Sequence, residues 1–202
     1  MSNQYIEPKY PVTYEEKIKR SVFIANLAPC HNESEANNFL KKIISEHRDA
    51  THNCRAYIIN SQEYFSDDGE PSGTAGRPIL LEIKKSGFSN LMLIVTRYFG
   101  GVKLGTRGLI DAYSGTAAKA LNMAEPEIKI VTREFEISLE YSQLGLITHT
   151  LENYNSEIIN RIYNENVVLS FRVPLDHCDA ILKDLNEFQA RGILKILENL
   201  SK

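Results

Sequence analysis

The chain has 202 residues and a formal net charge of −3, with 43% hydrophobic and 24% charged residues. This composition is typical of a globular protein, and it argues against a largely disordered chain and against a strongly basic nucleic-acid coat protein. The length allows one full domain or two small ones.

The sequence also lacks the features of membrane and secreted proteins. Its most apolar run, Leu91–Val95, has the length of a strand, far below the roughly 18 residues of a membrane-spanning helix. Residues 1–10 are polar and have no apolar signal-peptide core. Cys30, Cys54 and Cys178 are widely spaced, which predicts no disulfide framework. We therefore expect a cytoplasmic protein.

Charge and glycine content divide the chain near residue 125. Residues 1–125 carry 15 Lys and Arg against 14 Asp and Glu, whereas residues 126–202 carry 8 against 12. Nine of the 11 glycines also lie in the first part. Pro126 cannot continue the helical pattern that precedes it, so the sequence predicts two domains, 1–125 and 126–202.

The hydrophobic pattern predicts three strands and three helices in the first part, behind a polar N-terminal segment. The strands are expected at 21–28, 54–59 and 91–98, and the helices at 32–44, 75–83 and 105–121. Asn32 or Ser34 can cap the first helix, and Pro78 indicates the true start of the second. Residues 60–73 read as a polar, glycine-rich loop. The apolar run at 91–98 favours a buried, central strand.

The second part reads as β-α-β-β-α-β. The strands are expected at 129–141, 157–163, 167–173 and 193–197, and the helices from Ser142 to about Tyr154 and from Asp176 to Gly192. The turn at 164–166 joins the two middle strands as a hairpin. This order of elements is that of the ferredoxin-like fold.

Two glycine-rich loops, 67–78 and 96–108, each follow a strand and lead into a helix. Backbone N–H groups beside glycines at the N-terminus of a helix can bind an anion. The loops carry cations and hydroxyl donors for such a ligand: Arg77, Arg97, Lys103, Arg107, Ser72, Thr74 and Thr106. Neither loop has the P-loop or Rossmann pattern, and the alternative is that the glycines only shape tight connections.

The motifs DDGEPSGTAGRP, from Asp67, and VTRYFGGVKLGTRGL, from Val95, resemble the two signatures of the IMPACT/YigZ family, the UPF0029 proteins. Residues 50–57 and 19–25 match the pattern of this family as well, so the resemblance covers about residues 10–122. It implies an α+β protein whose N-terminal IMPACT domain is of the ribosomal protein S5 domain 2-like type. It also implies a C-terminal ferredoxin-like (βαββαβ) domain similar to one in elongation factor G.

Two residues depart from the usual bacterial pattern of the family. Arg107 stands where glycine is common, and Asp111 stands where a basic residue is common. The first adds a cation to the loop, and the second removes one from the helix that follows. The helix face after Gly108 is therefore not expected to be uniformly basic.

The resemblance implies a non-enzymatic regulatory protein associated with translation, which binds RNA or the ribosome. Eukaryotic relatives regulate a translation-control kinase through protein partners, so a protein partner is open here too. The expected binding residues are Arg77, Arg97, Tyr98, Lys103, Arg107, His52, Asp68, Glu70, Ser72 and Thr74. The cations would contact phosphates, and Tyr98 would stack on a base, although it can equally be a core residue. Phe99 is expected in the core. The acidic C-terminal domain is expected to dock a partner or gate the site.

The alternative is a hydrolase-type enzyme that acts on a phosphorylated or acyl small molecule at the 67–78 loop. The residue types that it needs are His52, Asp68, Glu70 and Ser72, and the two carboxylates can also hold Mg²⁺. A contact of His52 with Ser72 would support this alternative. The chain has no GxSxG elbow, however, and ion pairs with Arg77 or Arg97 explain the carboxylates without catalysis. Neighbouring Cys and His residues lack zinc-finger spacing, so no metal, cofactor or catalytic residue is predicted.

Overall fold

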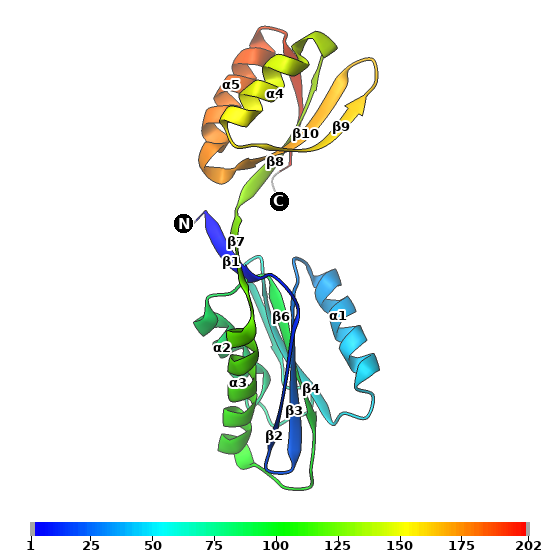
Figure 1. Ribbon diagram of the computed structural model, residues 1–202, viewed down its shortest axis with the longest axis vertical. Coiled ribbons are helices and arrows are strands. Elements are labelled where there is room, and N and C mark those ends of the chain that lie inside the picture. The colour runs from blue at the N-terminus through cyan, green and yellow to red at the C-terminus, as the bar shows by residue number, and fades with distance from the viewer. Residues whose placement is uncertain (1–2, 201–202) are drawn as a thin grey trace. The chain divides into compact units, whose positions relative to one another are not determined.

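The structure is a computed structural model that describes residues 3–200, and its contacts divide into two compact units (Figure 1). The N-terminal unit comprises residues 5–129. Residues 130–200 form the C-terminal unit together with Asn3 and Gln4. Within the part of the chain that is described, no helix is both long and apolar enough to cross a membrane.

A two-stranded sheet consists of β1 (Gln4–Pro8) and β7 (Pro126–Ile130). The sequence predicts neither strand as such, because it reads the N-terminal segment only as polar and residues 129–141 as one strand. That stretch is instead shared by β7 and β8 (Thr132–Leu139). Residues of β7 are alternately exposed and half-buried, so the strand has no buried apolar face that a hydrophobic pattern could reveal.

The N-terminal unit is built on an antiparallel sheet of five strands in the order β2-β3-β6-β4-β5. The strands are β2 (Val12–Ile18), β3 (Ser21–Pro29), β4 (His52–Ile59), β5 (Gln62–Ser66) and β6 (Leu91–Tyr98). The central, buried position predicted for β6 is confirmed. The prediction of a loop over 60–73 is wrong for β5, an edge strand whose residues are mostly exposed and therefore lack an apolar pattern.

Helices cover both faces of this sheet (Figure 1). Helices α2 (Gly76–Ser86) and α3 (Gly105–Met123) pack on one face, and α1 (Glu33–Glu46) packs on the other. Alternate residues of β6 therefore enter different cores, with Leu93 toward α2 and α3 and Ile94 toward α1. This double coverage explains why β6 reads as a continuous apolar run.

The first two helices begin where side-chain oxygens meet their N-terminal N–H groups. Asn32, one of the two candidates, caps α1 and accepts a hydrogen bond from the Glu35 N–H. Helix α2 begins at Gly76, two residues before the predicted Pro78, because the Asp67 carboxylate accepts hydrogen bonds from the Gly76 N–H and its neighbour. Proline is tolerated in the first turn, where its missing N–H would lack a helical partner.

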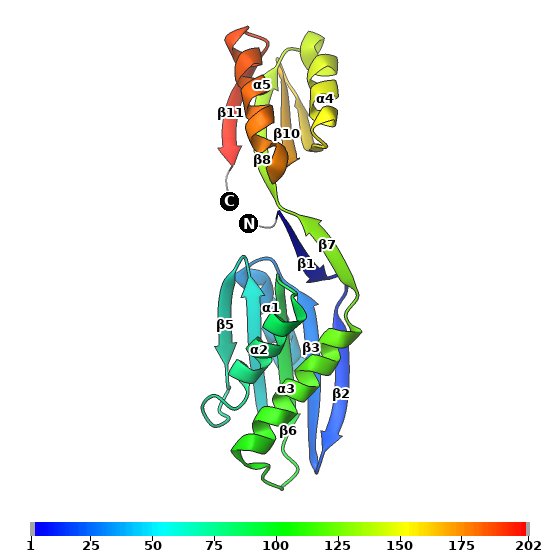
Figure 2. The same ribbon diagram turned by 90° about the vertical axis from the view of Figure 1, so that its left-hand side faces the viewer.

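The C-terminal unit has the predicted β-α-β-β-α-β order, and both helices cover one face of its sheet (Figure 2). Its elements after β8 are α4 (Leu144–Asn153), β9 (Glu157–Tyr163), β10 (Val167–Pro174), α5 (Cys178–Ala190) and β11 (Leu194–Leu200). The antiparallel strands lie in the order β11-β8-β10-β9. Short 3₁₀ turns precede α4 and α5, so Ser142 and Asp176 lie within those turns and do not cap the helices as predicted.

Candidate functional site

A cavity of about 450 Å³ opens in the N-terminal unit at the first turn of α3, and we call it the α3 cavity. It is lined by Thr51, His52, Glu70, Pro71, Arg97, Phe99, Lys103, Leu104, Gly105, Thr106 and Leu109. These residues come from the start of β4, the loop after β5, the end of β6 and the start of α3. Small-molecule sites occupy about 300–1,000 Å³ and combine an apolar wall with a few convergent polar groups, as this cavity does.

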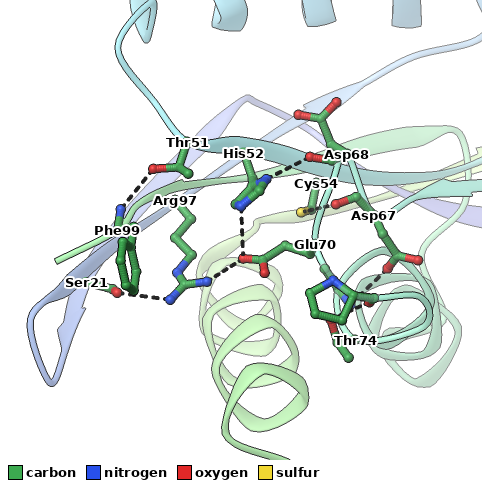
Figure 3. A network of polar contacts seen from close by, with 12 residues as sticks. Ser21, Thr51, His52, Cys54, Asp67, Asp68, Glu70, Thr74, Arg97 and Phe99 are labelled. Atoms are coloured by element: carbon green, nitrogen blue, oxygen red, sulfur yellow. Dashed lines mark hydrogen bonds and ion pairs between the residues drawn. The ribbon is translucent and has the colours of Figure 1, made fainter. Parts of the chain in front are cut away.

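A buried ion pair forms part of the wall (Figure 3). The Nη1 of Arg97 donates to Oε1 of Glu70 at 2.6 Å, and their side chains are only 5% and 3% exposed. The Tyr113 hydroxyl donates to the same oxygen at 2.8 Å, and Arg97 Nη2 donates to Ser21 Oγ at 3.2 Å. A buried pair is tolerated only when its remaining polar atoms are also satisfied. The buried Nε–H of Arg97, however, has no acceptor among the described residues.

His52 lies beside this pair in a defined orientation (Figure 3). Its Nδ1 is 2.8 Å from the carbonyl oxygen of Asp68. Because a carbonyl only accepts, Nδ1 carries a hydrogen. The other ring nitrogen, Nε2, is 3.8 Å from Glu70 Oε1, which is too long for a hydrogen bond. In neutral His52 this nitrogen is therefore an acceptor at the cavity wall, and residues 3–200 supply no hydrogen-bond donor to it.

In the first glycine-rich loop, 67–78, the carboxylate of Asp67 occupies the position where an external anion would bind. Oδ1 of Asp67 accepts from the N–H groups of Ala75 at 3.0 Å and Gly76 at 2.8 Å, and Oδ2 accepts from Gly73 at 2.8 Å. A carboxylate at a helix N-terminus is favoured by the helix dipole and by the unpaired N–H groups there. The N-terminus of α2 is thus occupied from within the chain.

The second glycine-rich loop leaves the N-terminus of α3 open. No side chain caps this helix, and its first turn has no acidic residue. Gly105 adopts φ +75°, a left-handed conformation that glycine allows without strain, and it lines the α3 cavity with Thr106. Lys103 lies just before this turn and has no ion pair among the described residues. Of the two loops, this one has the free donors that an external anion requires.

The α3 cavity brings together four of the ten residues that the sequence singles out. They are His52, Glu70, Arg97 and Lys103. Arg77 and Ser72 are exposed outside its lining, and Thr74 is buried with its hydroxyl donating to the Pro71 carbonyl at 2.6 Å. Asp68 is also outside the lining: its side chain accepts from the Asn53 N–H at 2.7 Å, and its backbone carbonyl contacts the cavity residue His52.

The two remaining predicted residues bind other side chains. The Tyr98 hydroxyl lies 2.9 Å from Nδ1 of His47, away from the cavity lining. The Nε of Arg107 lies 3.1 Å from the carboxylate of Asp111, so the two departures from the family pattern form an ion pair with each other. The positive charge that Arg107 adds is thereby offset by the carboxylate of Asp111.

The prediction that Phe99 belongs to the core is wrong. Its side chain is 44% exposed and lines the α3 cavity. The strand β6 ends at Tyr98, one residue earlier, so the buried pattern of the strand does not extend to it. Its position directly after the apolar run of β6 makes Phe99 resemble a core residue in the sequence. Thr51 and Leu104 of the lining lie within the family-like stretches 50–57 and 95–109, but they are not among the site residues predicted from the sequence.

The buried polar groups behind the cavity are not poised for catalysis. Burial raises the pKa of the Cys54 thiol to about 12, and its Sγ donates to the Asp67 carbonyl at 2.9 Å. A thiol in this state is not a nucleophile at neutral pH. Burial also raises the pKa of Tyr113 and keeps it a neutral donor. Among residues 3–200, no three His, Cys, Asp or Glu side chains are placed to hold a metal ion.

Comparisons with known proteins agree with this architecture. A family model described as the Impact N-terminal domain matches residues 19–121, and one described as a domain of unknown function (DUF1949) matches residues 137–189. The chain is 36% identical over 201 residues to an "IMPACT family member" of Haemophilus influenzae, covering 96% of this chain and 98% of that protein. It is 37% identical over 198 residues to "IMPACT family member YigZ" of Escherichia coli, covering 96% and 97% of the two chains.

The likeness extends to a relative from Bacillus subtilis and to a solved structure. The chain is 39% identical over 170 residues to "IMPACT family member YvyE" of Bacillus subtilis, covering 83% of this chain and 78% of that one. A crystal structure of a protein described as hypothetical matches it with a TM-score of 0.75 at 35% identity, covering 100% of both chains. On the matched family model and on relatives of this identity and coverage, the chain belongs to the IMPACT family.

Proposed function

We propose that this protein is a non-enzymatic regulator associated with translation, which acts in the cytoplasm and binds RNA or the ribosome through the α3 cavity. Membership of the IMPACT family supports the link to translation, since the family resemblance implies relatives that regulate a translation-control kinase. The binding proposal rests on one observation, the uncapped N-terminus of α3 at the cavity wall beside Lys103. Backbone N–H groups and a cation without an ion pair would together meet a phosphate.

The proposed anion-binding surface is small, because most nearby cations are already paired. Arg97 is engaged by Glu70, and Arg107 is engaged by Asp111. Arg77 lies outside the cavity lining. Lys103 and the N–H groups of α3 are therefore the main free donors, which suits contact with one or two phosphates. For single-stranded nucleic acid, each neutralised phosphate contributes about −0.7 to the slope of log affinity against log salt.

The hydrolase alternative has weaker support at this site. His52 lines the cavity, but Ser72 does not, and the Nδ1 of His52 is engaged by the Asp68 carbonyl. The carboxylates of Asp68 and Glu70 accept hydrogen bonds from different partners, the first from Asn53 and the second from Arg97. Ser72, the nucleophile of that mechanism, is therefore not placed beside His52, and the carboxylates of Asp68 and Glu70 are not paired with each other.

The proposal also assigns a fold type to each of the two domains. The N-terminal domain is taken as ribosomal protein S5 domain 2-like and the C-terminal domain as ferredoxin-like. The β-α-β-β-α-β order and the sheet order β11-β8-β10-β9 support the second assignment. The C-terminal domain would serve as a docking module for a protein or RNA partner, with an excess of acidic residues that favours a protein.

The test replaces Lys103 with alanine and uses Lys41→Ala as its matched control. Lys41 is an exposed lysine on α1, which covers the opposite face of the sheet. Binding to purified bacterial ribosomes and to a labelled single-stranded RNA is measured between 50 and 200 mM salt. Lys103→Ala should weaken binding several-fold and make the salt dependence shallower, whereas Lys41→Ala should change neither. Equal behaviour of the two variants would refute the assigned surface.

A further inference from the structure

We infer that the α3 cavity takes a single nucleotide unit, with its base stacked on Phe99 and its phosphate at the N-terminus of α3. This inference rests on the proposed function, and it names the chemical class of ligand that fills the site. The α3 cavity supplies three separate features for such a ligand: a fixed exposed aromatic ring, an open anion site and a pair of hydrogen-bond acceptors.

Phe99 is held in place by its backbone and not by burial of its ring. Its N–H donates to Thr51 Oγ1 at 3.1 Å, and the Thr51 N–H donates to the Arg97 carbonyl at 2.9 Å. The next residue, Gly100, packs so tightly that a Cβ there would lie 1.8 Å from the Arg20 carbonyl oxygen. The ring itself is 44% exposed. A fixed, exposed aromatic ring is a platform on which a nucleobase can stack.

The guanidinium of Arg97 supports this platform from the interior. Its carbon lies 5.2 Å from the ring centre of Phe99 and 5.4 Å from the ring centre of Phe23. Phe99 has no aromatic partner among the described residues. Arg97 lines the same cavity, is almost fully buried and has an Nε–H without an acceptor in the described part of the chain. Because this nitrogen is itself buried, Arg97 acts as a fixed support behind the ring and does not offer a donor to the ligand.

The phosphate position follows from how the three helices of the unit begin. Helix α1 has the Asn32 cap and two acidic residues in its first turn, and α2 has the Asp67 carboxylate. Helix α3 has neither, and its first residues line the cavity beside Lys103. An anionic group of the ligand would accept hydrogen bonds from the N-terminal N–H groups of α3, as side-chain oxygens do at α1 and α2.

The remaining wall selects a ligand that donates hydrogen bonds. Glu70 presents a carboxylate, and neutral His52 presents Nε2 as an acceptor. Sugar hydroxyls, which donate hydrogen bonds, would suit both groups. The 2′-hydroxyl of a ribonucleotide is such a donor, so the site is expected to prefer ribonucleotides to deoxyribonucleotides. At about 450 Å³ the cavity has room for a nucleoside and one phosphate.

A nucleotide unit of this kind has two sources: a free nucleoside monophosphate, or an unpaired nucleotide within an RNA. Calorimetric titrations of the full chain would compare a mixture of ribonucleoside 5′-monophosphates, an eight-residue single-stranded RNA, its DNA counterpart and inorganic phosphate. Tighter binding of the RNA than of the monophosphates assigns the unit to an RNA, and the reverse assigns it to the free nucleotide. Saturable binding of inorganic phosphate alone would overturn the inference, as would equal affinity for RNA and DNA.

The stacking contact is tested with Phe99→Leu and the matched control Phe65→Leu. Phe65 is 45% exposed on the edge strand β5 and does not line the cavity. Phe99→Leu should weaken nucleotide binding about ten-fold or more, and Phe65→Leu should not. Because both side chains are half exposed, both variants should stay folded, and thermal unfolding checks this.

The two proposals fail in different ways. Ribosome binding that is lost in Lys103→Ala but unchanged in Phe99→Leu would refute the nucleotide inference and leave the proposed function standing. Ribosome binding that is unchanged in Lys103→Ala would refute the proposed surface. Binding of the monophosphate mixture without any ribosome or RNA binding would support the nucleotide site and refute the proposed function.

Discussion

Arg97 and Glu70 are bonded to each other at 2.6 Å, with both side chains withdrawn from solvent, although they lie 27 positions apart in the sequence. Glu70 belongs to the loop after β5 and Arg97 to β6, and Tyr113 of α3 donates to the same carboxylate oxygen. The ion pair thus joins three elements around the α3 cavity. Because a buried charge without its partner is strongly unfavourable, the two residues act as one unit.

Removal of one member of this pair should therefore destabilise the protein more than removal of both. Glu70→Leu or Arg97→Met alone should lower the free energy of unfolding by about 3–5 kcal/mol, because one charge stays buried without its partner. The double variant should recover most of this loss, since apolar side chains of similar volume often replace a buried pair without penalty. Urea unfolding measures all three.

The exposed pair of Arg172 and Glu134 is the matched control, with a similar distance of 2.9 Å. Its single variants should change stability by less than about 1 kcal/mol, because solvent screens an exposed pair. Additive losses in the Glu70→Leu/Arg97→Met variant would show that the two residues are not coupled.

The buried Cys54 thiol makes stability depend on pH in the alkaline range. Its pKa rises from 9.0 to about 12 through burial, so the folded state holds this proton more tightly than the unfolded state. The contribution is complete below about pH 9 and is lost as the pH rises toward 12. One such proton lowers the free energy of unfolding by about 1.4 kcal/mol per pH unit in that window.

Urea unfolding at pH 8, 9, 10 and 11 tests this expectation against Cys54→Ala. The variant should be less stable at every pH, because it leaves a small cavity, and its alkaline decline should be shallower. Cys30 and Tyr113, whose pKa values are also raised by burial, keep part of the decline in both proteins. Identical slopes for the two proteins would show that Cys54 ionises normally in the folded state.

Gly100 is predicted to be essential for the fold around Phe99. An alanine Cβ would lie 1.8 Å from the Arg20 carbonyl oxygen, so the backbone would have to move. Gly100→Ala should lower the free energy of unfolding by at least about 2 kcal/mol, at the upper end of the range for overpacked sites. Gly115→Ala is the control: it has open space in the middle of α3 and should stabilise by about 0.5–1 kcal/mol. Thermal and urea unfolding distinguish the two outcomes.

The ion pair of Arg107 and Asp111 is predicted to limit RNA binding. Asp111→Asn removes the carboxylate that engages Arg107 and so frees a cation close to the N-terminus of α3. RNA affinity should rise a few-fold, and the magnitude of the salt slope should increase by about 0.7, the contribution of one phosphate. Asp179→Asn, an exposed change of the same kind on α5, serves as the control. A decrease in affinity for Asp111→Asn would contradict this expectation.

Most elements could be located from the sequence, including the edge strands β9 and β11, whereas β1, β2, β5 and β7 are not predicted as separate strands. The run at β6 and the cap of α1 by Asn32 are visible because apolar spacing and capping chemistry are local signals. Strand β5 is mostly exposed, and β7 has no buried face, so their pairing depends on partners elsewhere in the chain. Local patterns carry no information about such partners.

The site could be located in part for the same reason. The motifs indicate the two loops and include His52, Glu70, Arg97 and Lys103, which do lie together. Asp67 decides which of the two loops can bind an external anion. Its carboxylate occupies the N-terminus of α2 through hydrogen bonds to residues six to nine positions later in the sequence. The exposure of Phe99 likewise depends on the end of β6 and on Gly100. Both facts follow from three-dimensional packing and not from residue type.

The pairing of β1 with β7 has a consequence for biosynthesis. About 120 residues separate the two strands, so β1 leaves the ribosome long before its partner exists. At about 5–20 residues per second, this delay is on the order of ten seconds. During that time the backbone groups of β1 lack their partner strand and are open to pairing with other chains. This two-stranded sheet can therefore form only after β7 has emerged.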